Sequence, residues 1–200
     1  MFIKGENIMD LRVKKTHDNL QKALIILLNQ KSLENISVAE LCRIAEINRG
    51  TFYLHYKNVH GVFERYFNEI VKDLKFSYDF PYDVTKDNLA KLTPEMIQIF
   101  HHVKKYEAFY RIVFDEKTPM LYYHKLLETI RSFVMESHTE ETEHMSKQQL
   151  EYLASYTANS IIGLLLQWHK ENYILLPETL NQYIYDFHRL REVLQKKIKS

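Results

Sequence analysis

Apolar residues in this chain recur every three or four positions, the spacing that places them on one face of an α-helix. The first such pattern predicts a helix from about residue 13 to residue 29. Its stripe contains Leu20, Leu24, Leu27 and Leu28. A second helix of two turns is expected after Ser37, because Ser37 and Glu40 have the spacing of an N-terminal capping box.

A third, short helix is predicted after Asn48, a residue type that favours the N-cap position. Phe52 and Tyr56 stand four apart in it, so both side chains should point inward. A fourth helix should run from about Asn58 to Phe76, because "SYDFPYDVTKDN" breaks the helical pattern.

Helical signals continue to the end of the chain. Thr93 and Thr118 each precede a proline, a typical helix start, and a short aromatic helix is expected in "YEAFYRIVFDE". Ser146 should cap a long helix to about residue 172, and Pro177 should open the last one. Only four Gly and four Pro occur in 200 residues, so an all-α fold is predicted.

Charge adds a local signal to this pattern. The whole chain carries 27 basic and 26 acidic residues, but residues 1–60 carry nine basic and six acidic ones. The excess of positive charge therefore lies where the short helices are predicted, which favours a negatively charged partner there.

The single cysteine, Cys42, excludes an intramolecular disulfide and a cysteine-based zinc site, and it reads as a small buried apolar residue. The N-terminus has no long apolar core of a signal peptide, and "IIGLLL" is too short to span a bilayer. A cytoplasmic protein is expected.

Two short helices joined by a tight turn form a helix-turn-helix, whose second helix enters the major groove of DNA. An arginine can bind a guanine edge with two hydrogen bonds, hydroxyls can bind phosphates, and Lys57 precedes the N-terminus of the fourth helix. The expected DNA-binding residues are Ser37, Asn48, Arg49, Gly50, Thr51, Tyr53, His55 and Lys57. The competing interpretation, a helical hairpin with an aromatic core, is weakened by the two caps and the absence of acids from the outer face.

Residues 36–58, "ISVAELCRIAEINRGTFYLHYKN", resemble the helix-turn-helix of TetR-family transcriptional regulators. The resemblance covers residues 12–70, and Thr51-Phe52-Tyr53 followed by His55-Tyr56-Lys57 is specific for that family. "FYRIVFDEK" and "SIIGLLLQWHKENY" more weakly resemble a branch that includes activators of dihydroxyacetone kinase operons. One departure is Glu46, which stands where the family usually has glycine; a left-handed backbone there costs about 1 kcal/mol.

The resemblance implies a three-helix DNA-binding domain in residues 1–60 and a ligand-binding and dimerisation bundle in residues 61–200. The expected function is a regulator that binds a palindromic operator as a homodimer through its last two helices, under control of a small-molecule effector. The pattern does not distinguish a repressor from an activator. Two alternatives remain: a helical dimer whose helix-turn-helix binds a partner protein, and a small-molecule-binding enzyme.

The chain lacks a nucleophile motif, a phosphate-binding glycine loop and an isolated acid pair, so neither an enzyme nor a cofactor is predicted. His101-His102 and the segment 138–144 suggest metal ligands, but adjacent histidines of a helix point to different faces. No metal site is predicted.

Aromatic residues of the C-terminal part are candidates for lining an effector pocket. They are Tyr106, Phe109, Tyr110, Tyr123, Tyr152, Tyr156 and Trp168. Core packing is the more frequent role of any single one of them.

Overall fold

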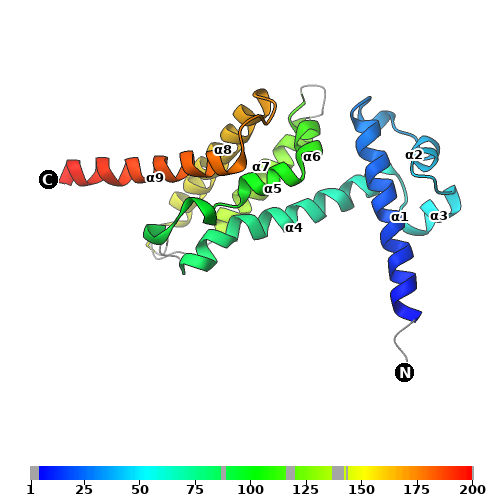
Figure 1. The fold of residues 1–200 in the computed structure, drawn as a ribbon, viewed down its shortest axis with the longest axis horizontal. Coiled ribbons are helices and arrows are strands. Elements are labelled where there is room, and N and C mark those ends of the chain that lie inside the picture. The colour runs from blue at the N-terminus through cyan, green and yellow to red at the C-terminus, as the bar shows by residue number, and fades with distance from the viewer. Residues whose placement is uncertain (1–4, 87–88, 116–119, 137–141, 143, 200) are drawn as a thin grey trace. The chain divides into compact units, whose positions relative to one another are not determined.

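The computed structural model describes residues 5–86, 89–115, 120–136, 142 and 144–199, with side chains except at 5–10, 89, 188 and 190–199. Every regular element in these residues is a helix (Figure 1), which confirms the predicted all-α fold. Contacts divide the chain into two compact units, Met1–Ile70 and Val71–Ser200. The boundary falls inside a helix and further along the chain than residue 60.

The first unit contains α1 (Gly5–Leu28), the 3-10 turn η1 (Leu33–Asn35), α2 (Val38–Ile44), α3 (Arg49–His55) and the beginning of α4 (Val59–Thr85). Helix α1 packs against α2, and α2 packs against α3. The predicted apolar stripes meet in this core, which includes the buried side chains of Leu20, Leu24, Leu27, Leu41, Cys42 and Phe52.

Side-chain caps begin the short helices. The Ser37 hydroxyl accepts a hydrogen bond from the Glu40 amide at 3.2 Å, while the Glu40 carboxylate is bound to Lys31 at 2.7 Å. Asn48 accepts from the Thr51 amide at 2.7 Å, and Asn58 accepts from the Gly61 amide at 2.9 Å. Each bond satisfies an amide that has no partner within its helix, so the N-caps predicted at Ser37 and Asn48 are confirmed.

The turn between α2 and α3 is a Schellman motif. The Ile47 amide binds the Cys42 carbonyl at 3.1 Å, and the Glu46 amide binds the Arg43 carbonyl at 3.4 Å. Glu46 has a φ of 56°, the left-handed conformation that glycine adopts most easily. The departure from the family pattern at this position is therefore a departure in residue type and not in backbone geometry.

Helix α4 runs to Thr85, well past the predicted end near Phe76, and contains Pro81. A proline inside a helix costs about 3 kcal/mol. Tertiary packing offsets this cost, because Tyr78 is buried and its ring lies 5.7 Å from that of Phe133. The Thr85 hydroxyl also donates to the Pro81 carbonyl at 2.7 Å.

The second unit contains η2 (Leu89–Lys91), η3 (Pro94–Met96), α5 (Ile99–Lys105), α6 (Glu107–Val113), α7 (Met120–Glu136), α8 (Lys147–Lys170) and α9 (Pro177–Lys199). The helix expected from Thr93 is divided, because Ile97 is extended and buried between η3 and α5. Ser146 and Gln149 form a capping box that begins α8. Predicted features at Thr118 and Pro119 lie outside the described residues.

Packing in the second unit joins α7 to α8 and places α9 on η3 and α5. The buried face of α8 consists of Ala154, Ala158, Ile162, Leu165 and Trp168. Among the described residues, no helix is long and apolar enough to cross a membrane.

Replacement of Glu46 by glycine should raise the free energy of unfolding by up to about 1 kcal/mol, because glycine adopts the left-handed backbone without steric cost. Urea denaturation of both proteins measures the difference. The control is Glu34→Gly in η1, where no positive φ occurs, and this change should not stabilise the protein. Equal stability of Glu46→Gly and the parent would contradict the prediction.

Candidate functional site

Helix α3 has a buried inner side and an accessible outer side. Phe52 is 0% exposed and Tyr56 is 9% exposed, as their four-residue spacing predicts. Arg49, Gly50 and Tyr53 are exposed on the outer side. The inner side thus fixes the helix to the first unit while the outer side stays available to a partner.

A hydrogen bond anchors the end of α3 to α1. The Tyr56 hydroxyl lies 2.6 Å from Nδ1 of His17, and the His17 and His55 rings meet edge to face at 5.1 Å. Burial raises the pKa of Tyr56 to about 12, whereas burial and the nearby Arg65 charge lower the pKa of His17. Both groups are therefore neutral at pH 7, and the hydroxyl donates to the imidazole.

The N-terminus of α3 depends on a small residue at position 50. A Cβ at Gly50 would lie 3.3 Å from Oδ1 of Asn48, closer than most such contacts. The same oxygen caps the helix through Thr51. A side chain at position 50 would therefore press on the cap that begins the helix.

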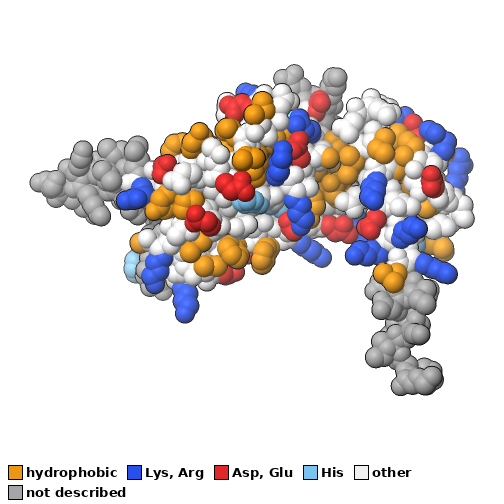
Figure 2. All heavy atoms as spheres, in the orientation of Figure 1, with side chains coloured by type: hydrophobic (Ala, Val, Ile, Leu, Met, Phe, Trp, Pro, Cys, Tyr) orange, Lys and Arg blue, Asp and Glu red, His pale blue; other side chains and the backbone are white. Residues whose placement is uncertain are grey.

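Of the other predicted DNA-binding residues, Thr51 and His55 are half-buried, and Ser37, Asn48 and Lys57 are exposed. All eight predicted residues lie on α3 or just before α2, α3 or α4. Leu54, which the sequence prediction did not include, is 81% exposed on the same helix. Its position next to Tyr53, a residue predicted to point outward, was the signal in the sequence for its exposure. Figure 2 shows Lys and Arg side chains spread over the surface of this unit.

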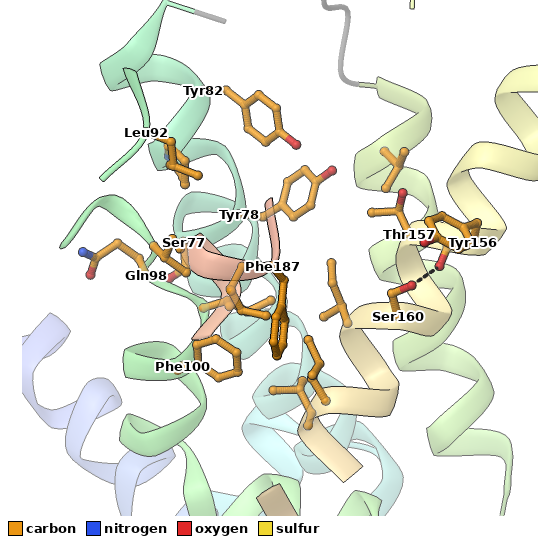
Figure 3. A pocket seen from close by; sticks show the side chains of 18 of the residues that line it. Ser77, Tyr78, Tyr82, Leu92, Gln98, Phe100, Tyr156, Thr157, Ser160 and Phe187 are labelled. Atoms are coloured by element: carbon orange, nitrogen blue, oxygen red, sulfur yellow. Dashed lines mark hydrogen bonds between the residues drawn. The ribbon is translucent and has the colours of Figure 1, made fainter. Parts of the chain in front are cut away.

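A cavity of about 540 Å³ lies in the second unit. Its walls come from the second half of α4, the segment from Leu92 to Phe100, the end of α7, the middle of α8, and α9. Figure 3 shows Tyr78 and Tyr82 on one side and Thr157 and Ser160 on the other. Phe187 of α9 extends between these two walls.

A polar chain with His102 and Tyr110 buried at its centre connects three helices of the second unit. His102 of α5 lies 2.7 Å from Asp73 of α4 through Nδ1 and 2.9 Å from the Tyr110 hydroxyl of α6 through Nε2. Lys105 binds the other oxygen of Asp73 at 2.7 Å. Because a carboxylate only accepts, Nδ1 of His102 carries the proton.

The pKa values agree with this assignment. Burial lowers the pKa of His102 and outweighs the Asp73 carboxylate, which favours protonation. Burial raises the pKa of Asp73, but the hydrogen bonds from Lys105 and His102 outweigh burial and hold the pKa below its ordinary value. A neutral imidazole thus bridges a charged carboxylate and a phenol hydroxyl.

The model of a protein family described as "Transcriptional regulator C-terminal region", a TetR-type domain, matches residues 90–189, half of the chain. The chain belongs to the TetR family of transcriptional regulators. This membership confirms the resemblance found in the sequence and the prediction of a non-enzymatic protein. It also favours a DNA-binding regulator over the two alternatives.

Three solved structures share the fold of the regulator. The dihydroxyacetone kinase operon activator DhaS is 18% identical with a TM-score of 0.58, and the match covers 88% of this chain and 95% of that one. A TetR regulator from Streptococcus agalactiae is 18% identical, with a TM-score of 0.54 and coverage of 90% and 96%.

NalD, the secondary repressor of the MexAB-OprM multidrug efflux pump in Pseudomonas aeruginosa, is 15% identical, with a TM-score of 0.57 and coverage of 88% and 94%. No curated protein sequence matches the regulator significantly. At these identities the solved structures support the fold alone.

The seven aromatic pocket candidates occupy different environments in the regulator. Tyr156 lines the cavity. Phe109, Tyr110 and Trp168 are buried in the core, Tyr106 and Tyr123 are half-buried, and Tyr152 is 73% exposed. These six residues are not among those that line the cavity.

Sequence reasoning missed the cavity residues on α4, including Ser77 and Tyr78, because the helix was expected to end before them. It also missed Gln98 and Phe100. Ser77 and Pro81 stand four residues apart and would share one face of a helix. This signal was not used, because a proline usually ends a helix.

No group of three potential metal ligands occurs within the described part of the regulator. His101 lies 3.3 Å from Asn181, and His102 belongs to the polar chain, so the two neighbours point to different partners. Residues 138–141 and 143 of the other histidine-containing segment lie outside the described residues.

The buried His102 should make the stability of the regulator depend on pH. Its folded-state pKa lies below the ordinary value of 6.5, so between these two values the unfolded chain binds the additional proton. The free energy of unfolding should fall as the pH decreases from about 7 to 5, and His102→Asn should reduce this slope. Chemical denaturation across the pH range measures both slopes. Equal slopes would contradict the assignment.

Proposed function

We propose that the regulator binds a palindromic operator as a homodimer and that a small-molecule effector controls its affinity for DNA. The observation that carries the proposal is the outer side of α3, where Arg49, Gly50 and Tyr53 are exposed while Phe52 anchors the helix. The DNA-binding domain is residues 1–60, and residues 61–200 bind the ligand and the second subunit. The regulator acts in the cytoplasm.

Each residue of the interface has a role that its chemistry supports. Arg49 reads a guanine edge, and the hydroxyls of Thr51 and Tyr53 bind phosphates. Lys57 and the N-terminal amides of α4 bind a further phosphate together. Ser37 and Asn48 hold the two helix starts in place while their exposed side chains face the backbone of the DNA.

Dimerisation is supported by an exposed stripe on α8. The stripe follows helical spacing and contains Tyr152, Tyr156, Asn159, Ser160, Gly163 and Gln167. A Cβ added at Gly163 would meet no atom within 4 Å, so the backbone is open to a close neighbour there. On α9, Tyr183 and Phe187 are exposed apolar residues.

Effector control is supported by helix α4. Its second half, including Ser77 and Tyr78, lines the cavity, and its first half belongs to the DNA-binding unit. A ligand that favours one position of α4 changes the spacing of the two recognition helices in the dimer. Operator affinity should then change about 5- to 150-fold, and by linkage DNA should change ligand affinity by the same factor.

Selection from random duplexes tests the operator assignment, because a homodimer should enrich a palindrome. Arg49→Ala should cost about 1 to 3 kcal/mol at one base pair and relax the choice of base there. Lys57→Ala should weaken binding to all sequences and reduce the salt slope by about one. Lys147→Ala in α8 is the control and should bind as the parent does. Parental affinity of both interface variants would refute the assignment.

Gly163→Trp should convert the dimer into a monomer, because a large side chain prevents close approach at this point of α8. Gly163 is exposed and a Cβ there meets no atom within 4 Å, so the fold should be retained, which circular dichroism checks. Sedimentation at micromolar concentration measures the mass. Gln148→Trp, in the first turn of the same helix, should remain dimeric. A monomeric parent would contradict the proposed assembly.

A further inference from the structure

The side chains that line the cavity are mostly apolar. About 540 Å³ is enough for a drug-sized ligand, yet no Asp, Glu, Lys, Arg or His occurs among the described residues that line it. Aliphatic and aromatic side chains predominate, including Phe100, Leu164 and Phe187. A charged ligand would lose its hydration here without gaining an opposite charge.

Two of the hydroxyl groups that line the cavity, those of Ser77 and Ser160, already donate their protons to the backbone. The Ser77 hydroxyl donates its proton to the Asp73 carbonyl at 2.9 Å, and the Ser160 hydroxyl donates to the Tyr156 carbonyl at 2.9 Å. Each hydroxyl has one proton, so the oxygen of each of these two lining residues keeps its capacity to accept a hydrogen bond. Ser77 lies on the α4 side and Ser160 on the α8 side of the space (Figure 3).

We infer that the effector of this regulator is an uncharged, largely apolar small molecule that carries a hydroxyl or N–H donor. This inference rests on the proposed effector control and specifies the chemistry of its ligand. The donor group binds Ser77 or Ser160, and the apolar body contacts Phe100 and Phe187. The described walls offer no counter-charge to a carboxylate, a phosphate or an ammonium group, so they favour an uncharged ligand.

The position of Trp168 provides a readout. Its ring lies 5.8 Å from that of Phe100, which lines the cavity, while Trp168 itself is buried behind that wall. Trp168 is the single tryptophan of the chain. Occupation of the cavity should therefore alter tryptophan emission without direct contact between ligand and indole.

Two dyes with the same aromatic skeleton test the inference on the full-length regulator. N-phenylnaphthylamine is neutral and has one N–H donor, whereas anilinonaphthalenesulfonate adds a sulfonate. The neutral dye should bind with a stoichiometry of one per subunit, quench or shift Trp168 emission, and be preferred at least about tenfold. Equal affinity for the two dyes, or preference for the anion, overturns the inference.

Matched variants at Thr157, which lines the cavity, locate the bound dye. Thr157→Met and Thr157→Lys introduce side chains of similar length that differ in charge. Thr157→Met should retain the preference for the neutral dye, and Thr157→Lys should reverse it in favour of the sulfonate. An unchanged preference in Thr157→Lys places the dyes elsewhere and overturns the inference.

A second subunit is the competing occupant of this space, because Tyr156 and Ser160 belong both to the cavity and to the exposed stripe of α8. Dye binding to the Gly163→Trp monomer but not to the parent dimer would show that the partner fills the cavity, and would overturn the inference. Operator binding is measured in parallel. If the parent regulator binds operator DNA but not the neutral dye, the inferred ligand class is refuted and the proposed function stands. If the parent regulator binds no operator DNA, the proposed function is refuted.

Discussion

Burial of Phe52 and Tyr56 is the constraint on which the DNA-binding unit depends. A seven-residue helix is too short to be stable by itself, so α3 takes its orientation from the side chains that it buries. Phe52 enters the core, and Tyr56 is bound to His17 of α1. Rotation of the helix would expose both rings, and the same contacts therefore keep Arg49 and Tyr53 on the outside.

In the second unit the corresponding constraint is polar. The chain from Lys105 through Asp73 and His102 to Tyr110 fixes α4 against α5 and α6. Buried polar groups are expensive when they lose a partner, so the chain restricts these helices to arrangements that keep all its bonds. Both α4 and α5 also contribute cavity walls, and a ligand between them acts on helices whose positions are already specified.

The two sites of the regulator have opposite chemistry. The outer side of α3 carries cations and hydroxyls in contact with water, which suits a polyanion that releases its counterions. The described walls of the cavity carry no charged side chain and suit a molecule that prefers to leave water. Helix α4 is the covalent connection between the two units, so any communication along the backbone passes through its residues.

Local signals in the sequence were sufficient to predict features that depend on residues close together in the chain. The caps at Ser37, Asn48 and Ser146 begin helices where predicted, because a side chain binds an amide three residues away. Four-residue spacing likewise predicted which side of α3 is buried. The resemblance also singled out Glu46 as a non-glycine residue in the turn, and its φ of 56° is left-handed.

Contacts between residues distant in sequence decided the extent of α4 and the lining of the cavity. Pro81 is a local signal for a helix end, but burial of Tyr78 against Phe133 of α7 keeps α4 helical. The cavity joins side chains from separate helices, so aromatic content alone did not distinguish Tyr156, which lines it, from Trp168, which fills the core. The sequence by itself determined the helices, their starts and the face of α3, because these follow from contacts three or four residues apart. The extent of α4 and the walls of the cavity follow from packing between elements, which no local pattern encodes.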